Sequence, residues 1–340
     1  MSSARKSLPS YDTVSPARRR VVASVAAALA LAGSRTSAQP ERIRRVGVLA
    51  PSTAAKEAIT LRPFFDEMRA LGWIEGSDVA YDLAFAADDQ ARLAALAAEL
   101  VGRAPHVIYA PPQSAAMVAR RATSTIPIVF ATATDPVGFG LVQSLAKPGG
   151  NVTGIATLAT TLVPKALEIL REVMPNARRL GVLGDPADPR WKADLDALAA
   201  LASSFGIAVA SAATRTERDI EAAFARLVAE RVDVVFTNSS FIFNHRRTVV
   251  ALARKARIPV VGHRAEFVDA GALFAYGAPL ASQIRRSAHL VDRVLKGARP
   301  ADMPVEQSTL IELVVNLRTA RELGVTVPAS ILARAERVVE

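Results

Sequence analysis

Two stretches of this chain repeat each other in sequence and in order. Arg44–Leu49 reads RRVGVL and returns as RRLGVL at Arg178–Leu183. The apolar runs at 106–109 (HVIY) and 126–129 (IPIV) return in the same order at 233–236 (DVVF) and 258–261 (IPVV). Stretches rich in Ala, Leu and Arg, typical of helices, separate these β-branched runs. The shared order of strand, helix and Ile-Pro strand indicates that one lobe has been duplicated.

Each half has the pattern of a parallel sheet covered by helices, because short apolar strands alternate with helical stretches. The 340 residues are too many for one ordinary core and suit two such lobes. We therefore expect an α/β protein with two doubly wound parallel-sheet lobes. The cleft between two such lobes would hold a ligand, since parallel sheets bind ligands at the carboxyl ends of their strands. Within this frame we expect one helix over Ile59–Leu71 and a last strand at Ile311–Asn316.

The first 38 residues differ from the rest of the chain. Three arginines at 18–20 precede the apolar run Val21–Ala32, which has the length of a signal-peptide core and is too short to span a membrane. Small residues at 36–38 (TSA) match what a signal peptidase reads, so we expect a signal peptide over 1–38 and export to the periplasm. Both the twin-arginine and the general secretory routes fit. The alternatives are a disordered tail and a short buried helix.

Charge and cysteine content limit the partners of the exported chain. Residues 1–38 hold six Lys/Arg and one acidic residue, so their removal lowers the net charge from +10 to about +5. Arginines scattered over helices are typical of a solvated surface rather than a nucleic-acid interface, so we expect no nucleic-acid partner. The chain has no cysteine, which excludes disulfides and the lipid-bearing cysteine of a bacterial lipoprotein. We expect a free, monomeric periplasmic protein.

Residues that would support catalysis are sparse. The four histidines, at 106, 245, 263 and 289, are far apart and lack metal-ligand spacing. The sequence has no nucleophile elbow and no P-loop, and the turn Ala50–Thr53 lacks the glycines that a dinucleotide requires. We therefore expect no metal, no cofactor and no catalytic residue.

Small hydrogen-bonding residues instead follow the predicted strands. They are Ser52 and Thr53 after the first strand, Gln113 and Ser114 after the third, Thr134 and Asp135 after the fourth, and Asn238 and Ser240 after the matching strand of the second half. Unpaired backbone N–H groups at such turns suit a carboxylate, although the same residues also serve as ordinary N-caps. Asp135 could bind a ligand's ammonium group or only form an Asp-Pro turn. Phe241, Phe243 and Tyr276 could line an apolar wall, with ordinary core packing as the alternative, which is favoured for Phe243 and less so for Tyr276.

Several runs resemble the ABC-transporter substrate-binding family that includes tryptophan-binding lipoproteins. They are 127–131 (PIVFA), 134–138 (TDPVG), 145–154 (LAKPGGNVTG), 243–247 (FNHRR), 266–268 (EFV) with Gly271, 276–277 (YG), 304–307 (PVEQ) and 313–317 (LVVNL). The likeness covers roughly residues 44–340, and its most specific part is the run at 147–154 (KPGGNVTG).

The resemblance implies a type I periplasmic-binding-protein fold, with two lobes joined by a three-strand hinge. Residues 43–157 and 276–303 would form the N-terminal lobe, and 158–275 and 304–340 the C-terminal lobe. Family members deliver a small solute to a membrane permease and close around it by a hinge motion. By motif, Asp135, Asn151, Glu266 and Tyr276 become cleft residues, with Asn151 serving the crossover turn as the alternative.

The chain departs from the family pattern at two turns that would face the ligand. A Gly-Thr-Pro-type turn is expected where 111–114 reads PPQS, and Asp-Pro or Asp-Asn where 238–240 reads NSS. The leading hypothesis is the solute-binding protein of an ABC importer, with a small, amino-acid-like or other polar-headed ligand. A sensory module that docks on a receptor or kinase is the first alternative, and an exported α/β hydrolase is the weaker one.

Overall fold

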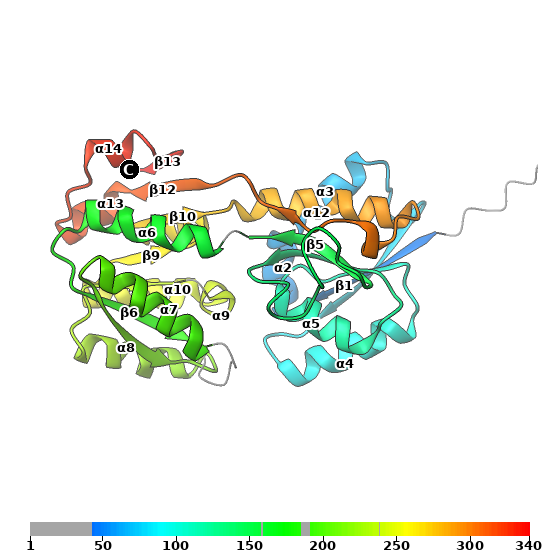
Figure 1. Ribbon diagram of the computed structural model, residues 1–340, viewed down its shortest axis with the longest axis horizontal. Helices are drawn as coiled ribbons and strands as arrows, with labels where there is room; N and C mark the ends of the chain where they lie inside the picture. Colours follow the sequence, from blue (N-terminus) through cyan, green and yellow to red (C-terminus); the bar gives the residue numbers. More distant parts are fainter. Residues whose placement is uncertain (1–42, 158, 185–190, 238) are drawn as a thin grey trace, which may run out of the picture. The chain divides into compact units, whose positions relative to one another are not determined.

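The computed structural model describes residues 43–340 apart from 158, 185–190 and 238 (Figure 1). The described residues from Ile43 onward form one compact unit. None of their helices is both long enough and apolar enough to cross a membrane. The predicted signal peptide, 1–38, lies outside the described residues.

Two sheets organise the described chain, and their strands pair mostly in parallel. The first has the order β11-β5-β4-β3-β1-β2, and the second β13-β12-β10-β9-β8-β6-β7. The first comprises β1 (Arg44–Ala50), β2 (Val79–Phe85), β3 (Val107–Tyr109), β4 (Ile128–Ala133), β5 (Val152–Ala156) and β11 (Glu306–Gln307). The second comprises β6 (Arg179–Gly184), β7 (Ala208–Ala213), β8 (Val234–Phe236), β9 (Val260–Gly262), β10 (Phe274–Gly277), β12 (Glu312–Asn316) and β13 (Arg337–Val339). Among the described strands, only β10 and β12 pair antiparallel.

The sequence repeat is also a repeat of topology. Strands β2-β1-β3-β4-β5 and β7-β6-β8-β9-β10 have the same order, and the register matches as well. Gly47 of β1 lies opposite Ile108, and the equivalent Gly181 of β6 lies opposite Val235. An added Cβ would come within 3.3 Å of Leu100 at the first glycine and within 3.1 Å of a leucine at the second, so each lets a helix pack closely.

The residues just before β3 and β8 also occupy equivalent positions, but their side chains differ. His106 Nδ1 accepts the backbone N–H of Arg45 at 2.9 Å, and Asp233 Oδ2 accepts that of Arg179 at 2.8 Å. Burial and the neighbouring Arg44 lower the pKa of His106, so the ring is neutral and its Nδ1 can accept a hydrogen bond.

The prediction of an α/β chain with two doubly wound parallel sheets is confirmed.

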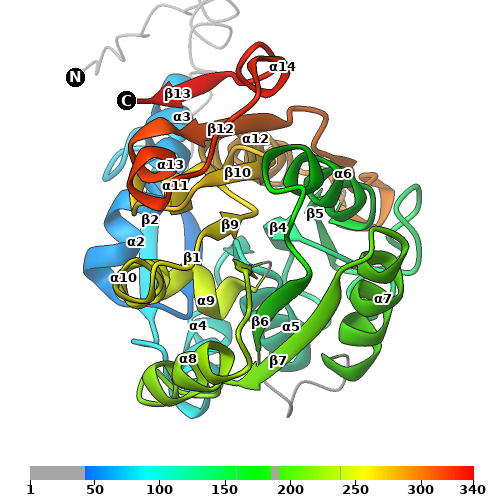
Figure 2. The same ribbon diagram turned by 90° about the vertical axis from the view of Figure 1, so that its left-hand side faces the viewer.

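Helices cover both faces of each sheet. Around the first sheet they are α2 (Ala54–Thr60), α3 (Arg62–Ala70), α4 (Gln90–Gly102), α5 (Gln113–Ala122) and α12 (Leu280–Leu295). Around the second they are α6 (Ala159–Val173), α7 (Trp191–Ser204), α8 (Asp219–Ala229), α9 (Ser240–Asn244), α10 (Arg246–Ala256), α11 (Ala265–Asp269), α13 (Leu317–Leu323) and α14 (Ala329–Leu332). Figure 2 shows α6 and α7 on one side of the second sheet, and α8 and α10 on the other.

Helix α12 comes from the far end of the sequence and completes the first sheet. Its apolar face, including Ile284, Leu290 and Val291, is buried with α3 against this sheet. Figure 1 shows α12 beside α3. Each such side chain contributes about 1.5–3 kcal/mol on burial. Trp73 Nε1 also donates to Asp292 Oδ1 at 2.9 Å, which ties the helix to the loop after α3.

The described chain passes between the two sheets at three places: after β5, after β10, and between β11 and β12. Tyr276 and Gly277 are the last residues of β10 and lie in the second sheet, whereas β11 lies in the first sheet. The lobe limits 43–157 with 276–303, and 158–275 with 304–340, stay a prediction.

Two local predictions were wrong. The single helix expected over Ile59–Leu71 is two helices with a break at Leu61, because Pro63 has no N–H and starts a new helix. β12 is not the last strand, since β13 follows and pairs parallel to it. The short run RVV at 337–339 is too brief to identify a strand without its neighbour.

The docking of α12 can be tested at Tyr109. Its hydroxyl lies 2.8 Å from Ser287 Oγ, which donates its own hydrogen to the Ile284 carbonyl at 2.7 Å. Tyr109→Phe should lower the free energy of unfolding by about 1 kcal/mol, and Ser287→Ala by about 1–3 kcal/mol because it leaves a buried hydroxyl unpaired. Urea unfolding of both variants and the double variant should show a combined loss smaller than the two single losses together. Simple additivity would mean that these residues do not interact.

The close approach of β10 to the end of β9 gives a second prediction. A Cβ at Gly277 would lie 1.9 Å from the His263 carbonyl oxygen, a backbone atom that cannot rotate away. Gly277→Ala should destabilise the protein by roughly 3 kcal/mol through overpacking. Gly150→Ala is the matched control, since a Cβ there meets nothing within 4 Å. Equal melting temperatures for the two variants would contradict the close approach.

Candidate ligand-binding site

A phenylalanine between two arginines lies at the carboxyl ends of β8 and β9. Phe243 is on α9, whose N-cap Ser239 accepts the N–H of Ile242 at 3.5 Å. The Arg246 guanidinium carbon lies 4.6 Å from the Phe243 ring centroid, and that of Arg264 lies 5.4 Å from it. Phe243 packs against apolar clusters of both sheets, so this ring lies where the two lobes meet.

His263 joins the ends of the two strands that carry this cluster. Its Nδ1 lies 2.9 Å from the Thr237 carbonyl oxygen. Burial, with a smaller effect of Arg264, lowers the pKa of His263 to about 3, so the ring is neutral and Nδ1–H donates to the carbonyl. The His263 ring centroid lies 6.1 Å from Phe243 and 5.4 Å from Phe267, which completes an aromatic group.

Arg264 is the most unusual residue of this cluster. Its Nη1 is buried and has no hydrogen-bond partner among the described residues. Burial lowers the pKa of Arg264, yet a guanidinium stays protonated in proteins. The carboxylate of Glu266 favours the charged forms of both Arg246 and Arg264, and the carboxylate of Asp269 also favours the charged form of Arg246. Because its Nη1 has no partner among the described residues, Arg264 can donate a hydrogen bond to one further negative group.

The first sheet has its own buried polar residues where β1 ends. Ser52 is 1% exposed, and its Oγ has no partner in the described part of the chain. Glu57 on α2 is 8% exposed. Burial raises the pKa of Glu57 to about 7, against a hydrogen bond from the Ser52 backbone N–H that lowers it. Thr53 is the N-cap of α2, and its hydroxyl accepts the N–H of Lys56 at 3.5 Å.

The predicted turns after β3 and β4 do come together. Gln113 Oε1 accepts the backbone N–H of Thr134 at 3.0 Å and of Asp135 at 3.2 Å. Asp135 Oδ1 in turn accepts the N–H of Gly138 at 2.8 Å, which closes the Asp-Pro turn. Ser114 and Thr134 are exposed. In this structure, Gln113 and Asp135 thus satisfy backbone groups of the turns.

The remaining predicted residues are dispersed. Asn238 lies outside the described residues, and Ser240 is the first residue of α9. Glu266 lies in the first turn of α11 beside the arginine cluster. Asn151 Nδ2 donates to the carbonyls of Thr123 and Ile126 at 3.1 and 2.7 Å, so it ties the start of β5 to the loop between α5 and β4.

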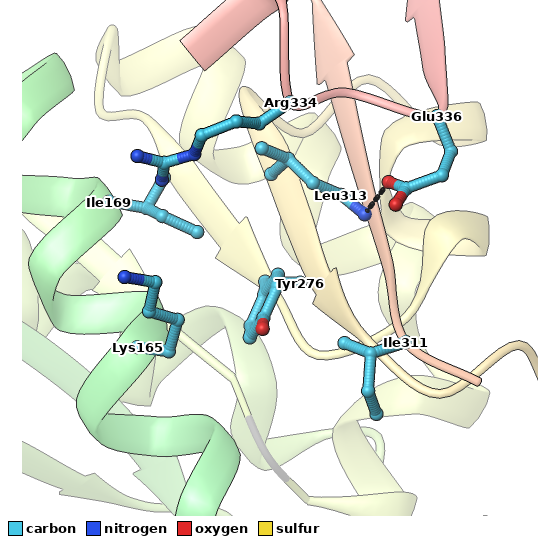
Figure 3. Close-up of a pocket in the computed structure, with 7 residues that line it drawn as sticks. All are labelled: Lys165, Ile169, Tyr276, Ile311, Leu313, Arg334 and Glu336. Carbon is cyan, nitrogen blue, oxygen red and sulfur yellow. Dashed lines mark hydrogen bonds between the residues drawn. The ribbon is translucent and has the colours of Figure 1, made fainter. Parts of the chain in front are cut away.

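Tyr276 lines a different pocket, of about 200 Å³, on the second sheet (Figure 3). The lining residues are Lys165, Ile169, Tyr276, Ile311, Leu313, Arg334 and Glu336. Their charged groups already have partners, because Lys165 pairs with Glu168 at 2.6 Å and Arg334 with Glu172 at 3.1 Å. Glu336 accepts the Leu313 N–H, as Figure 3 shows. The charged groups that line this pocket are therefore engaged within the protein.

The sequence prediction missed Arg264, Arg246 and Glu57. The only signal was positional, since Arg264 lies two residues after the end of β9 and Glu57 lies five residues after Ser52. Charged side chains are normally exposed, and the sequence does not show that Glu57 is buried and that both arginines are half-buried.

Comparisons with known proteins agree on one family. The family model described as "ABC transporter substrate binding protein" matches residues 48–339. A tyrosine-binding protein of Clostridioides difficile (strain R20291) is 28% identical over 261 residues, covering 76% of this chain and 75% of the relative.

Solved structures agree as well. A conserved domain protein from Vibrio cholerae O1 biovar El Tor has a TM-score of 0.81 and 29% identity, covering 87% of this chain and 100% of that one. A domain from Streptococcus pneumoniae in complex with L-Trp has a TM-score of 0.79 and 26% identity, with the same coverage.

The fold is that of a type I periplasmic binding protein. Proteins of this family bind solutes, are not enzymes, and work with a membrane permease. The match extends over most of the chain, which belongs to the ABC transporter substrate-binding protein family.

Proposed function

We propose that this protein is the periplasmic solute-binding component of an ABC importer and binds a small amino-acid-like ligand between its two lobes. The observation that carries the proposal is the buried Nη1 of Arg264, which lacks a hydrogen-bond partner among the described residues. A ligand carboxylate would supply both the acceptor and the negative charge. Neutral sugars and nucleosides cannot supply that charge.

The surroundings of Arg264 favour a ligand with an apolar, flat side chain. Phe243, His263 and Phe267 present three rings within about 6 Å of one another, and His263 is neutral. Rings of this kind pack well against aromatic side chains. The relative from C. difficile is named for tyrosine, and the S. pneumoniae domain holds L-Trp. Aromatic amino acids are therefore the first ligands to test.

The proposal includes export and a permease partner. The apolar run Val21–Ala32 and the small residues at 36–38 support a signal peptide that is cleaved after Ala38. Arg18–Arg20 suit the twin-arginine route, and the general secretory route is the alternative. The mature monomer would then carry its ligand to the permease. Ser52 and Glu266 are proposed as further ligand-facing residues, one in each lobe.

A ligand screen tests this function. L-tryptophan and L-tyrosine should raise the melting temperature of the purified protein, whereas neutral sugars and nucleosides should not. Arg264→Gln should weaken binding by about 2 kcal/mol or more, roughly thirtyfold in Kd, because the carboxylate loses a buried cation. Arg247→Gln, an exposed arginine of the same region, is the matched control. Stabilisation by sugars or nucleosides instead of amino acids, or wild-type affinity in Arg264→Gln, would refute the proposal.

A further inference from the structure

Glu57 is a buried carboxyl group without a cationic partner. It is 8% exposed, on α2 directly after the end of β1. No lysine, arginine or histidine of the described chain forms an ion pair with it. Its neighbouring charges are already engaged, since Lys56 Nζ and Asp88 Oδ2 pair with each other at 3.5 Å. A carboxylate in this position is costly unless something outside the chain compensates its charge.

The polar groups around Glu57 cannot compensate it either. The Ser52 backbone N–H donates to the carboxylate, but it carries no charge. Tyr109 is close enough for Glu57 to raise its pKa, yet its hydroxyl hydrogen points to Ser287 Oγ at 2.8 Å, since Ser287 donates its own hydrogen elsewhere. The Ser52 hydroxyl is buried and unpaired among the described residues. Two groups therefore follow the end of β1: the Ser52 hydroxyl, which can donate and accept a hydrogen bond, and the Glu57 carboxyl group, whose negative charge no cation of the described chain neutralises.

We propose that the Glu57 carboxylate binds the ligand's ammonium group, and that the Ser52 hydroxyl accepts a further hydrogen bond from this ammonium group. This inference rests on the proposed function and assigns the second charge of an amino-acid ligand. Arg264 offers a half-buried guanidinium with a buried Nη1 near the strand ends of the second sheet, and Glu57 offers a buried acidic group near those of the first. A zwitterion complements both, whereas a deaminated acid complements only Arg264.

Proton release follows from this assignment. Burial raises the pKa of Glu57 to about 7, so near neutral pH about half of the empty protein carries the proton there. A bound ammonium group favours the carboxylate, and the displaced proton leaves to solvent. Affinity should therefore fall as the pH drops below 7, by about thirtyfold between pH 8.5 and pH 5.5. Amino-acid ligands keep their own charges over this range.

Few other charged groups can imitate this pH profile. Three titratable groups interact with Glu57: Lys56 on α2, Asp88 in the loop after β2, and Tyr109 on β3. Burial raises the pKa of Tyr109 far above neutrality. In the other lobe, His263, with a pKa of about 3, stays neutral from pH 5.5 to 8.5.

The test compares L-tryptophan with indole-3-propionate, its analogue without the amino group, on wild type and Glu57→Gln. Wild type should prefer L-tryptophan at pH 8 and lose about thirtyfold in affinity at pH 5.5. Glu57→Gln should bind L-tryptophan at least tenfold more weakly at pH 8, lose the pH dependence, and keep its affinity for indole-3-propionate. Glu75→Gln, an exposed glutamate of the same lobe, should behave like wild type.

Two further measurements do not require the Glu57→Gln variant to bind a ligand. Calorimetry of wild type at pH 6 in two buffers of different ionisation enthalpy should show close to one proton released per L-tryptophan bound. Without ligand, Glu57→Gln should melt higher than wild type at pH 8 but not at pH 5. The sign follows because the folded pKa lies above the ordinary value, so stability from this group is lost as the pH rises through 7.

The outcomes separate this inference from the proposed function. Wild-type affinity and pH profile in Glu57→Gln, or no proton release, would overturn the role of Glu57 while leaving amino-acid binding intact. Absence of binding by both L-tryptophan and L-tyrosine to wild type would overturn the proposed function, and the assignment of Glu57 with it.

Discussion

Hydrogen bonding between parallel strands brings the carboxyl ends of neighbouring strands to the same edge of a sheet. In the second sheet this places His263, at the end of β9, against the Thr237 carbonyl at the end of β8. In the first it brings Gln113, after β3, to the backbone of the turn after β4. Residues 20 or more positions apart in sequence thus share one edge, and the candidate site depends on this pairing.

The polar residues at these edges divide by what their hydrogen bonds satisfy. Thr53, Gln113 and Asp135 accept backbone N–H groups, so they hold the turns in shape. Ser52, Arg264 and also Thr214, which follows β7, bury polar atoms that no described group satisfies. Because an unsatisfied buried polar atom is costly, it persists in a folded protein where a ligand or water can satisfy it. The proposals above therefore rest on Ser52 and Arg264, which combine such an atom with a position at the candidate site.

The sequence predicts the sheets well because the repeated strands carry their own signal. Gly47 and Gly181, with the β-branched runs around them, indicate equivalent strands, and their registers are equivalent. It fails where neighbours decide the structure, as at β13, which becomes a strand only beside β12. For the site it predicts polar turns but not Glu57 or Arg264, since burial of a charged side chain arises from tertiary packing.

The desolvated charges of Glu57 and Arg264, which have opposite signs, also explain why a ligand would stabilise the empty protein. Desolvation disfavours the ionised form of Glu57 and of Arg264, as the directions of their pKa shifts show. A ligand that carries both complementary charges removes both costs at once, whereas a ligand with one charge removes one. Lobe closure responds only to a difference in affinity between states. On the proposals above, a zwitterion that needs a group from each lobe gains most when the two lobes come together, so the same pair of charges would select the ligand and favour closure around it.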